Sequence, residues 1–169
     1  VLGHQVDIFT RCQEPSNPPI VEIADRLRLM HIPAGPSQHV PKKELVQFIP
    51  EFVTHVHEFC QAERLQYDVL HCHYYMSGIA GLQLQPQLAA LSGRPLPIVA
   101  TFHTLALMKN LVARGELELE DSGRIEAELE LVRAAAAIIA PSESDASYLE
   151  YLYQADPSRV CVIPPGVDT

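Results

Sequence analysis

Short runs of β-branched and apolar residues alternate along the chain with longer segments whose apolar residues recur at helical spacing. The short runs predict strands at Val6–Phe9, Leu27–Ile32, Val69–His73, Ile98–Thr101, Ala136–Ala140 and Val160–Ile163. The longer segments predict helices at Lys43–Glu63, Ile79–Leu91, Gly123–Arg133 and from Ser142 through Tyr153. Strands separated by helices predict an α/β fold, a doubly wound parallel sheet covered by helices on both faces.

Prolines and capping residues locate bends and ends within these helices. Pro50 predicts a bend in the first helix and Pro86 a break in the second, because proline has no N–H to donate to the preceding turn. Ser142 fits the N-cap of the last helix, with Asp145 three residues later imitating a capping box.

Both ends of the sequence read as parts of a larger fold. Gly3 fits the left-handed residue that ends a helix, yet only two residues precede it. We therefore expect a domain truncated at its N-terminus, with its first strand and helix outside the sequence. The stiff turn that begins at Pro164-Pro165-Gly166 predicts the start of an inter-domain linker. The expected organisation is a partial domain over residues 1–163 and a linker over 164–169.

Length and charge restrict the partners of this domain. A chain of 169 residues is long enough for one domain with a full core. Asp plus Glu outnumber Lys plus Arg by 21 to 12, and the formal net charge of −9 argues against nucleic acid and against a basic membrane-binding face. The longest apolar run, around Ala134–Ala140, is too short to cross a bilayer. An anionic ligand would have to be held by a few well-positioned Lys or Arg side chains. The sequence leaves the oligomeric state open.

The cysteines and histidines predict neither a disulfide framework nor a metal site. Four scattered cysteines, without a C-x-x-C pair, are interpreted as structural thiols of a reducing, cytoplasmic protein; they are Cys12, Cys60, Cys72 and Cys161. His71 and His73 share one side of a strand, but Cys72 between them points to the other side. We therefore expect partly buried histidines and no metal ion.

Candidate ligand-binding residues follow the strands, because ligands of open parallel sheets bind at the carboxyl ends of the strands. Lys42 and Lys43 open a helix, where the positive end of the helix dipole disfavours a cation, so their placement hints at an anion. Two solvated lysines are the structural alternative. Tyr74 places a phenol at a strand end, and Gly78 permits close approach of a ligand to the backbone.

The next strand end and the helix beyond it add further candidates. His103 and Thr104 follow the strand Ile98–Thr101, and Lys109 comes shortly after them. The alternative for Thr104 is a helix N-cap. Arg124 begins a helix whose opposite, apolar face carries Leu129 and Val132.

Arg124 can aim its planar fork at a phosphate, or pair with Glu128 four residues later on the helix surface. Taken together, Lys42, Tyr74, Thr104 and Arg124 lie on loops or helix starts that can converge on one edge of the sheet. Two cations and two hydroxyls make a plausible phosphate cradle.

Several segments resemble the retaining family 4 glycosyltransferases, in the correct order and over essentially the whole chain. These segments are Gly3–Val6 with Phe9–Thr10, His71–Tyr74 with Gly78, Thr101–Leu105, Arg124–Glu128 and Val162–Asp168. The similarity looks closest to the subgroup that holds sucrose-phosphate synthases and D-inositol-3-phosphate N-acetylglucosaminyltransferases.

The resemblance implies the N-terminal, acceptor-binding domain of a GT-B enzyme, in which two Rossmann-like domains face each other across a cleft. By motif, the residues that hold the acceptor phosphate in the inositol-phosphate enzymes fall on Lys42, Tyr74, Thr104 and Arg124. The active-site histidine of the family, near the transferred sugar, falls on His103.

The implied reaction moves a hexosyl group from a nucleotide sugar, UDP- or GDP-linked, to a phosphorylated acceptor with retention, without a cofactor or metal. The glycine-rich first loop and the second GT-B domain, which holds the nucleotide sugar, would lie outside the sequence. The 169 residues alone are therefore expected to be inactive. The stretch Gln83–Arg94 looks longer than in the inositol-phosphate enzymes, so fructose 6-phosphate, inositol phosphate and lipid-linked inositol all stay open as acceptors.

Two other classes of function are weighed against a transferase. A nicotinamide-dependent oxidoreductase shares the α/β pattern, but no G-x-G-x-x-G occurs in the sequence. A non-catalytic sugar-phosphate-binding domain would keep the same loops without the chemistry.

Overall fold

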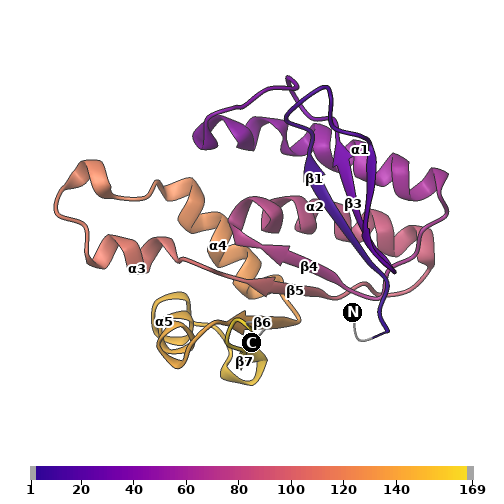
Figure 1. The fold of residues 1–169 in the computed structure, drawn as a ribbon. Coiled ribbons are helices and arrows are strands. Elements are labelled where there is room, and N and C mark those ends of the chain that lie inside the picture. Colours follow the sequence, from indigo (N-terminus) through magenta and orange to yellow (C-terminus); the bar gives the residue numbers. More distant parts are fainter. Residues whose placement is uncertain (1–2, 167–169) are drawn as a thin grey trace. The chain divides into compact units, whose positions relative to one another are not determined.

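The computed structural model describes residues 3–166 (Figure 1). The chain divides into two compact units. Unit 1 is Val1–Leu65 and unit 2 is Gln66–Thr169. Unit 1 contains β1 (Val6–Arg11), β2 (Ile20–Ala24), β3 (Leu27–Ile32), the 3-10 helix η1 (Lys42–Phe48) and α1 (Ile49–Ala62). No helix in the described part of the chain has the length and apolar character needed to span a membrane.

Unit 1 is built on a three-stranded sheet with the order β1-β3-β2. β1 and β3 are parallel, with Val6 opposite Leu27, whereas β2 runs antiparallel to β3. β2 was not predicted from the sequence. It is joined to β3 by Asp25 and Arg26 alone, a connection that only antiparallel strands permit, and Arg26 takes a positive φ of 62° there.

The first predicted helix is present as two segments, a 3-10 helix and an α-helix, which meet next to Pro50. A 3-10 turn precedes α1, and Pro50 lies at the start of α1, where a missing N–H leaves no helical bond unmade. Ile49, Val53, Val56 and Cys60 are buried and recur at helical spacing along α1, as an amphipathic helix requires. Gly3 has the left-handed backbone expected of it, with φ of 85°, and the helix it would end lies outside the described residues.

Unit 2 contains a four-stranded parallel sheet with the order β4-β5-β6-β7, which confirms the α/β class. Its strands are β4 (Leu70–His73), β5 (Ile98–Thr101), β6 (Ala137–Ala140) and β7 (Val160–Val162). Its helices are α2 (Tyr74–Ser92), α3 (Ala106–Leu111), η2 (Glu116–Glu118), α4 (Ser122–Ala134), α5 (Glu143–Tyr153) and η3 (Pro157–Arg159). Each strand pairs with the next one along the chain, so right-handed crossovers place the connecting helices on one face of this sheet.

The predicted break at Pro86 is wrong, because α2 runs without interruption from Tyr74 to Ser92. The helix contacts β4, β5 and α4 along its length, and this packing offsets the backbone hydrogen bond that Pro86 cannot make. α2 also begins five residues before the predicted start at Ile79. The N-cap at Ser142 is confirmed, since its Oγ accepts a hydrogen bond from Asp145 N at 3.1 Å.

The core of unit 2 lies between this sheet and its helices. Its fully buried members include Ala100, Leu131, Ala135, Ile138 and Leu149. Cys72 belongs to it, and burial raises the pKa of its thiol to about 11, as expected for a structural cysteine. Cys161, interpreted from the sequence as another small core residue, is instead exposed on β7.

Gly78 allows α2 and α4 to pack closely in unit 2. A Cβ atom at this position would lie 2.4 Å from Cδ2 of Leu131, a fully buried side chain of α4. The glycine predicted from the sequence to let a ligand approach the backbone therefore admits a neighbouring helix.

We expect a Gly78→Val variant to unfold more easily by about 1–3 kcal/mol, because added methyl groups cannot fit against Leu131. Chemical denaturation measures this loss. Gly115→Val is the matched control: nothing lies within 4 Å of a Cβ there, so its free energy of unfolding should change by less than about 0.5 kcal/mol. Equal stability of the two variants would contradict the close contact.

Candidate functional site

A cluster of aromatic rings lies at the carboxyl ends of β4 and β5. The rings of His73 and His103 are stacked at a centroid distance of 5.3 Å, and the ring of Tyr74 lies 4.7 Å from that of His103. His71 adds a further ring, 4.3 Å from His73. His71 and His73 each keep a surface exposed to solvent, and the rings packed against them bury the rest. The parallel pairing of β4 with β5 brings these strand ends together, with His73 opposite Thr101.

Hydrogen bonds fix the orientation of the three histidine rings. Nδ1 of His73 lies 3.0 Å from Nε2 of His103, so one of these nitrogens donates its proton and the other accepts. Nε2 of His71 lies 2.7 Å from Oγ1 of Thr101. The tautomer of His103 is therefore tied to that of His73.

The cluster disfavours positive charge on the two β4 histidines. Partial burial lowers the pKa of His71, and the neighbouring His73 and His103 lower it further. The pKa of His73 is likewise lowered, first by burial and then by His103. Both imidazoles are thus favoured in the neutral form, which can accept as well as donate a hydrogen bond.

Tyr74 carries the most unusual backbone conformation of this edge. Its φ of 63° is in the left-handed region, which a non-glycine residue adopts at some cost in free energy. The conformation turns the chain directly from β4 into α2, and the Tyr74 side chain is 42% exposed beside His103. The strand end thus holds a phenol available to a ligand.

Arg124 makes a dense set of contacts in unit 2. Its Nη2 donates to the carbonyl oxygen of Thr104 at 3.2 Å and to Thr104 Oγ1 at 3.3 Å. Its Nε donates to Oε1 of Glu128 at 2.8 Å. Nη1 lies 2.8 Å from Oε1 of Glu120. The guanidinium thus connects the start of α4 with the loop that follows β5.

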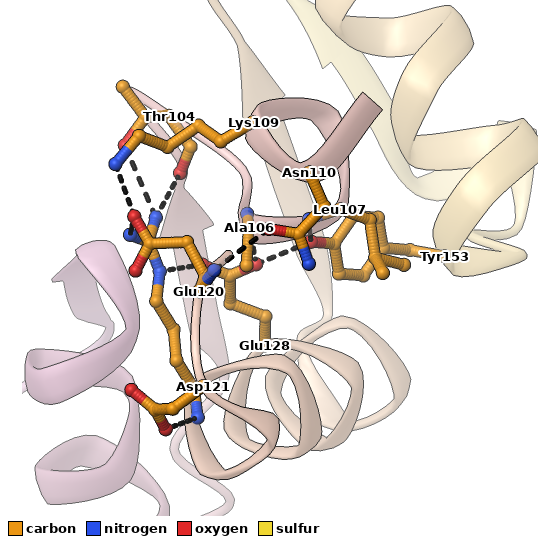
Figure 2. A network of polar contacts seen from close by, with 10 residues as sticks. Thr104, Ala106, Leu107, Lys109, Asn110, Glu120, Asp121, Glu128 and Tyr153 are labelled. Carbon is orange, nitrogen blue, oxygen red and sulfur yellow. Dashed lines mark hydrogen bonds and ion pairs between the residues drawn. The ribbon is translucent and has the colours of Figure 1, made fainter. Parts of the chain in front are cut away.

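Glu128 is fully buried at the centre of this network, which Figure 2 shows from close by. Its Oε2 accepts from the backbone N–H of Ala106 at 2.9 Å and from the hydroxyl of Tyr153 at 2.5 Å. The Tyr153 hydroxyl in turn accepts from the N–H of Leu107 at 2.9 Å. Two N–H groups at the start of α3 are thereby satisfied by side chains from α4 and α5.

Glu120 closes the network on its more exposed side. Its carboxylate pairs with Nζ of Lys109 as well as with Arg124, and its backbone N–H donates to Oδ1 of Asn110 at 2.8 Å (Figure 2). The hydrogen bond from Lys109 lowers the pKa of Glu120 most, with a further contribution from Arg124. Burial alone lowers the pKa of Arg124, but the attraction of the carboxylates of Glu128 and Glu120 outweighs it, so the pKa of Arg124 is raised.

The structure brings some of the predicted residues together within unit 2. Thr104 and Arg124 are in direct contact, and the ring of Tyr74 packs beside that of His103 at a tilt. Lys109 reaches the same network through Glu120. Lys42 begins η1 in unit 1 and is exposed. Thr104 does not cap a helix, because α3 begins at Ala106 with Leu105 at its N-cap position.

The pairing of Arg124 with Glu128 is confirmed, but not as a surface contact. The sequence predicted that Arg124 lies opposite the apolar residues of this helix. In the structure it lies on the buried face of α4. Glu128 and Tyr153 were not predicted as part of the site. Glu128 is three residues before Leu131 and four before Val132, so its place on the apolar face could have identified it. Among residues 3–166, no group of three or more His, Cys, Asp and Glu side chains is arranged to hold a metal ion.

Replacing Glu128 by Gln should lower the free energy of unfolding by about 3–5 kcal/mol, because it leaves the buried guanidinium of Arg124 short of a countercharge. Urea denaturation measures this loss. Glu130→Gln removes the same charge from an exposed position of α4 and should stay within about 0.5 kcal/mol of the wild type. A Glu128→Gln variant as stable as the Glu130→Gln variant would show that the pair does not hold the fold.

The histidine cluster predicts a loss of stability in mild acid. Unfolded histidines gain protons near the ordinary pKa of 6.5, whereas folded His71 and His73 resist protonation, so stability is lost as the pH falls through this value. A His71→Gln/His73→Asn double variant should lose less stability between pH 7.5 and pH 5.5 than the wild type, as measured by denaturation at each pH. His39→Gln, in an exposed loop of unit 1, is the control. Parallel pH profiles for the wild type and the double variant would refute the prediction.

The chain was compared with protein families, curated proteins and solved structures. A model of glycosyltransferase family 4 matches residues 2–169. A D-inositol 3-phosphate glycosyltransferase of Catenulispora acidiphila is 39% identical over 98% of this chain and 37% of its own length. One from Xylanimonas cellulosilytica is 37% identical over 98% of this chain and 39% of its own length.

A solved structure of sucrose-phosphate synthase from Thermosynechococcus elongatus superposes with a TM-score of 0.85 and 27% identity, covering 99% of this chain and 39% of that one. The chain therefore spans about two fifths of the length of these relatives. The α/β fold corresponds to the N-terminal Rossmann-like domain of a GT-B enzyme. The family match over nearly every residue decides against the oxidoreductase alternative, and the chain belongs to glycosyltransferase family 4.

Proposed function

We propose that this chain is the acceptor-binding part of a glycosyltransferase that moves a hexosyl group from a nucleotide sugar to a phosphorylated acceptor, with retention at the anomeric carbon. Family membership supports transfer of a sugar. The names of the relatives, D-inositol 3-phosphate glycosyltransferase and sucrose-phosphate synthase, support an acceptor or product that carries a phosphate. In this proposal, residues 1–163 form the acceptor domain and 164–169 begin the connection to the donor domain.

The contact between Arg124 and Thr104 is the observation that carries the proposal. The guanidinium of Arg124 bonds to both the carbonyl and the hydroxyl of Thr104 and so fixes the loop that follows β5. A ligand bound at the carboxyl end of β5 would contact this loop. Arg124 supplies charge, and the hydroxyls of Thr104 and Tyr74 supply neutral donors for phosphate oxygens. Lys42, at the start of η1 in unit 1, stays a prediction from the sequence resemblance as a second cation for the phosphate.

His103 is proposed as the residue that meets the transferred sugar and the acceptor hydroxyl. Its hydrogen bond with His73 and its contact with the ring of Tyr74 restrict the rotation of the ring. Catalysis would come chiefly from holding the acceptor hydroxyl in line with the donor, because correct orientation removes an entropic barrier from the reaction.

The nucleotide sugar, UDP- or GDP-linked, is assigned mainly to the second GT-B domain, without a metal ion or other cofactor. The leaving diphosphate would be stabilised there by fixed cations and hydrogen-bond donors. The scattered thiols favour a cytoplasmic setting. The 169 residues alone should therefore bind acceptor but transfer no sugar.

The phosphate cradle can be tested without removing the buried charge of Arg124. In the full-length protein, Tyr74→Phe and Thr104→Val should each raise the Kd for inositol 3-phosphate roughly tenfold, since a hydrogen bond to a charged group is worth about 1.5–3 kcal/mol. The Kd for unphosphorylated inositol should change by less than about twofold, because the lost bond is made only to phosphate. Isothermal titration calorimetry measures both constants.

Tyr151→Phe is the control, because Tyr151 lies on α5 with its side chain 85% exposed. It should leave both dissociation constants unchanged. Equal losses of affinity for inositol and inositol 3-phosphate in the Tyr74 and Thr104 variants would count against a phosphate site at these residues. Fructose 6-phosphate, titrated in parallel, distinguishes between the two acceptor classes that the relatives represent.

A further inference from the structure

The charges around Arg124 already balance in unit 2. Arg124 is paired with Glu128 and with Glu120, and Glu120 is also paired with Lys109. The ion pairs therefore join two cations to two carboxylates. A phosphate dianion added to this set would meet no excess of positive charge from these four side chains, and it would lie close to the carboxylate of Glu120.

Glu120 contacts a different nitrogen of the Arg124 guanidinium from the one that Glu128 binds. Arg124 is only 2% exposed, and its Nη1 atom has no partner in hydrogen-bond geometry among the described residues. The same atom nevertheless lies 2.8 Å from Oε1 of Glu120. Nη1 of Arg124 thus keeps an unused donor, although the carboxylate of Glu120 lies next to it.

The ion pairs of Glu120 are weak enough for a more strongly charged anion to displace its carboxylate. Its side chain is 19% exposed, against 1% for Glu128, and Lys109 is 47% exposed. Oε1 of Glu120 is shared between Lys109 and Arg124, as Figure 2 shows for Glu120 and Lys109. Pairs with exposed partners are worth little, whereas a phosphate offers three acceptor oxygens and nearly twice the charge.

We propose that Glu120 determines specificity for a phosphorylated acceptor: its carboxylate occupies the anion position between Arg124 and Lys109, and the acceptor phosphate displaces it. The proposal rests on the proposed function of the Arg124 site. Displacement releases Nη1 of Arg124 and Nζ of Lys109 to the phosphate, so Lys109 becomes a direct ligand. An unphosphorylated sugar has no anion with which to displace Glu120, and it meets a closed, neutral cluster.

The test measures the Kd of the full-length protein for inositol 3-phosphate and for inositol. Glu120→Gln removes the competing charge at constant size and should tighten binding of inositol 3-phosphate roughly tenfold, with little change for inositol. Glu126→Gln is the matched control, because it removes the same charge from an exposed position of α4. It should leave both constants within about twofold of the wild type, as screened surface charges do.

A second variant keeps the test decisive if Glu120→Gln folds poorly. Glu120→Asp retains the charge but shortens the arm, so it should also bind inositol 3-phosphate more tightly than the wild type, though less than the Gln variant. Unchanged or weaker binding of inositol 3-phosphate by the Glu120 variants overturns the proposal, and parallel weakening for inositol would make Glu120 a ligand of an acceptor hydroxyl.

The Thr104→Val variant, measured in the same series, separates this proposal from the proposed function. If Thr104→Val weakens binding of inositol 3-phosphate while Glu120→Gln does not strengthen it, the cradle stands and the displacement of Glu120 is wrong. If Thr104→Val has no selective effect, the cradle itself fails and the displacement fails with it.

Discussion

The buried carboxylate of Glu128 is the group on which the strand-end loops of unit 2 depend. A charge without exposure to water is tolerated only when opposite charge and hydrogen bonds surround it. Glu128 obtains these from three places: Arg124 on its own helix, the N–H of Ala106 at the start of α3, and Tyr153 at the end of α5. One side chain therefore fixes three helices relative to the loop that carries His103 and Thr104.

Residues far away in the sequence cap the N-terminus of α3, which has no capping side chain of its own. α3 has six residues, and Leu105 at its N-cap position offers no side-chain acceptor. The N–H groups of Ala106 and Leu107 are satisfied by Glu128 and Tyr153. A short helix stabilised in this way keeps its first turn in place only while α4 and α5 are packed, which links the order of the site to the core.

The positive charges of the Arg124 network are balanced by carboxylates, so the network carries little net charge. Partial burial and the neighbouring histidines lower the pKa values of His71 and His73, and Lys109 and Arg124 are paired with carboxylates. In a chain with a net charge of −9 the overall field opposes an anion, so the anionic acceptor that we propose would have to be attracted by local rearrangement of such pairs.

The sequence by itself determined the α/β class, the strands of both sheets except β2, and the positions of Tyr74, His103 and Thr104 after their strands, because hydrophobic periodicity and strand-end positions are local properties. It could not determine α3, whose cap comes from distant residues, or the continuity of α2 through Pro86, which depends on contacts with β4, β5 and α4. It also read the pair of Arg124 and Glu128 as a surface contact. Only the tertiary structure buried that pair, because burial depends on which helices pack over α4, and an i,i+4 spacing is the same on either face of a helix.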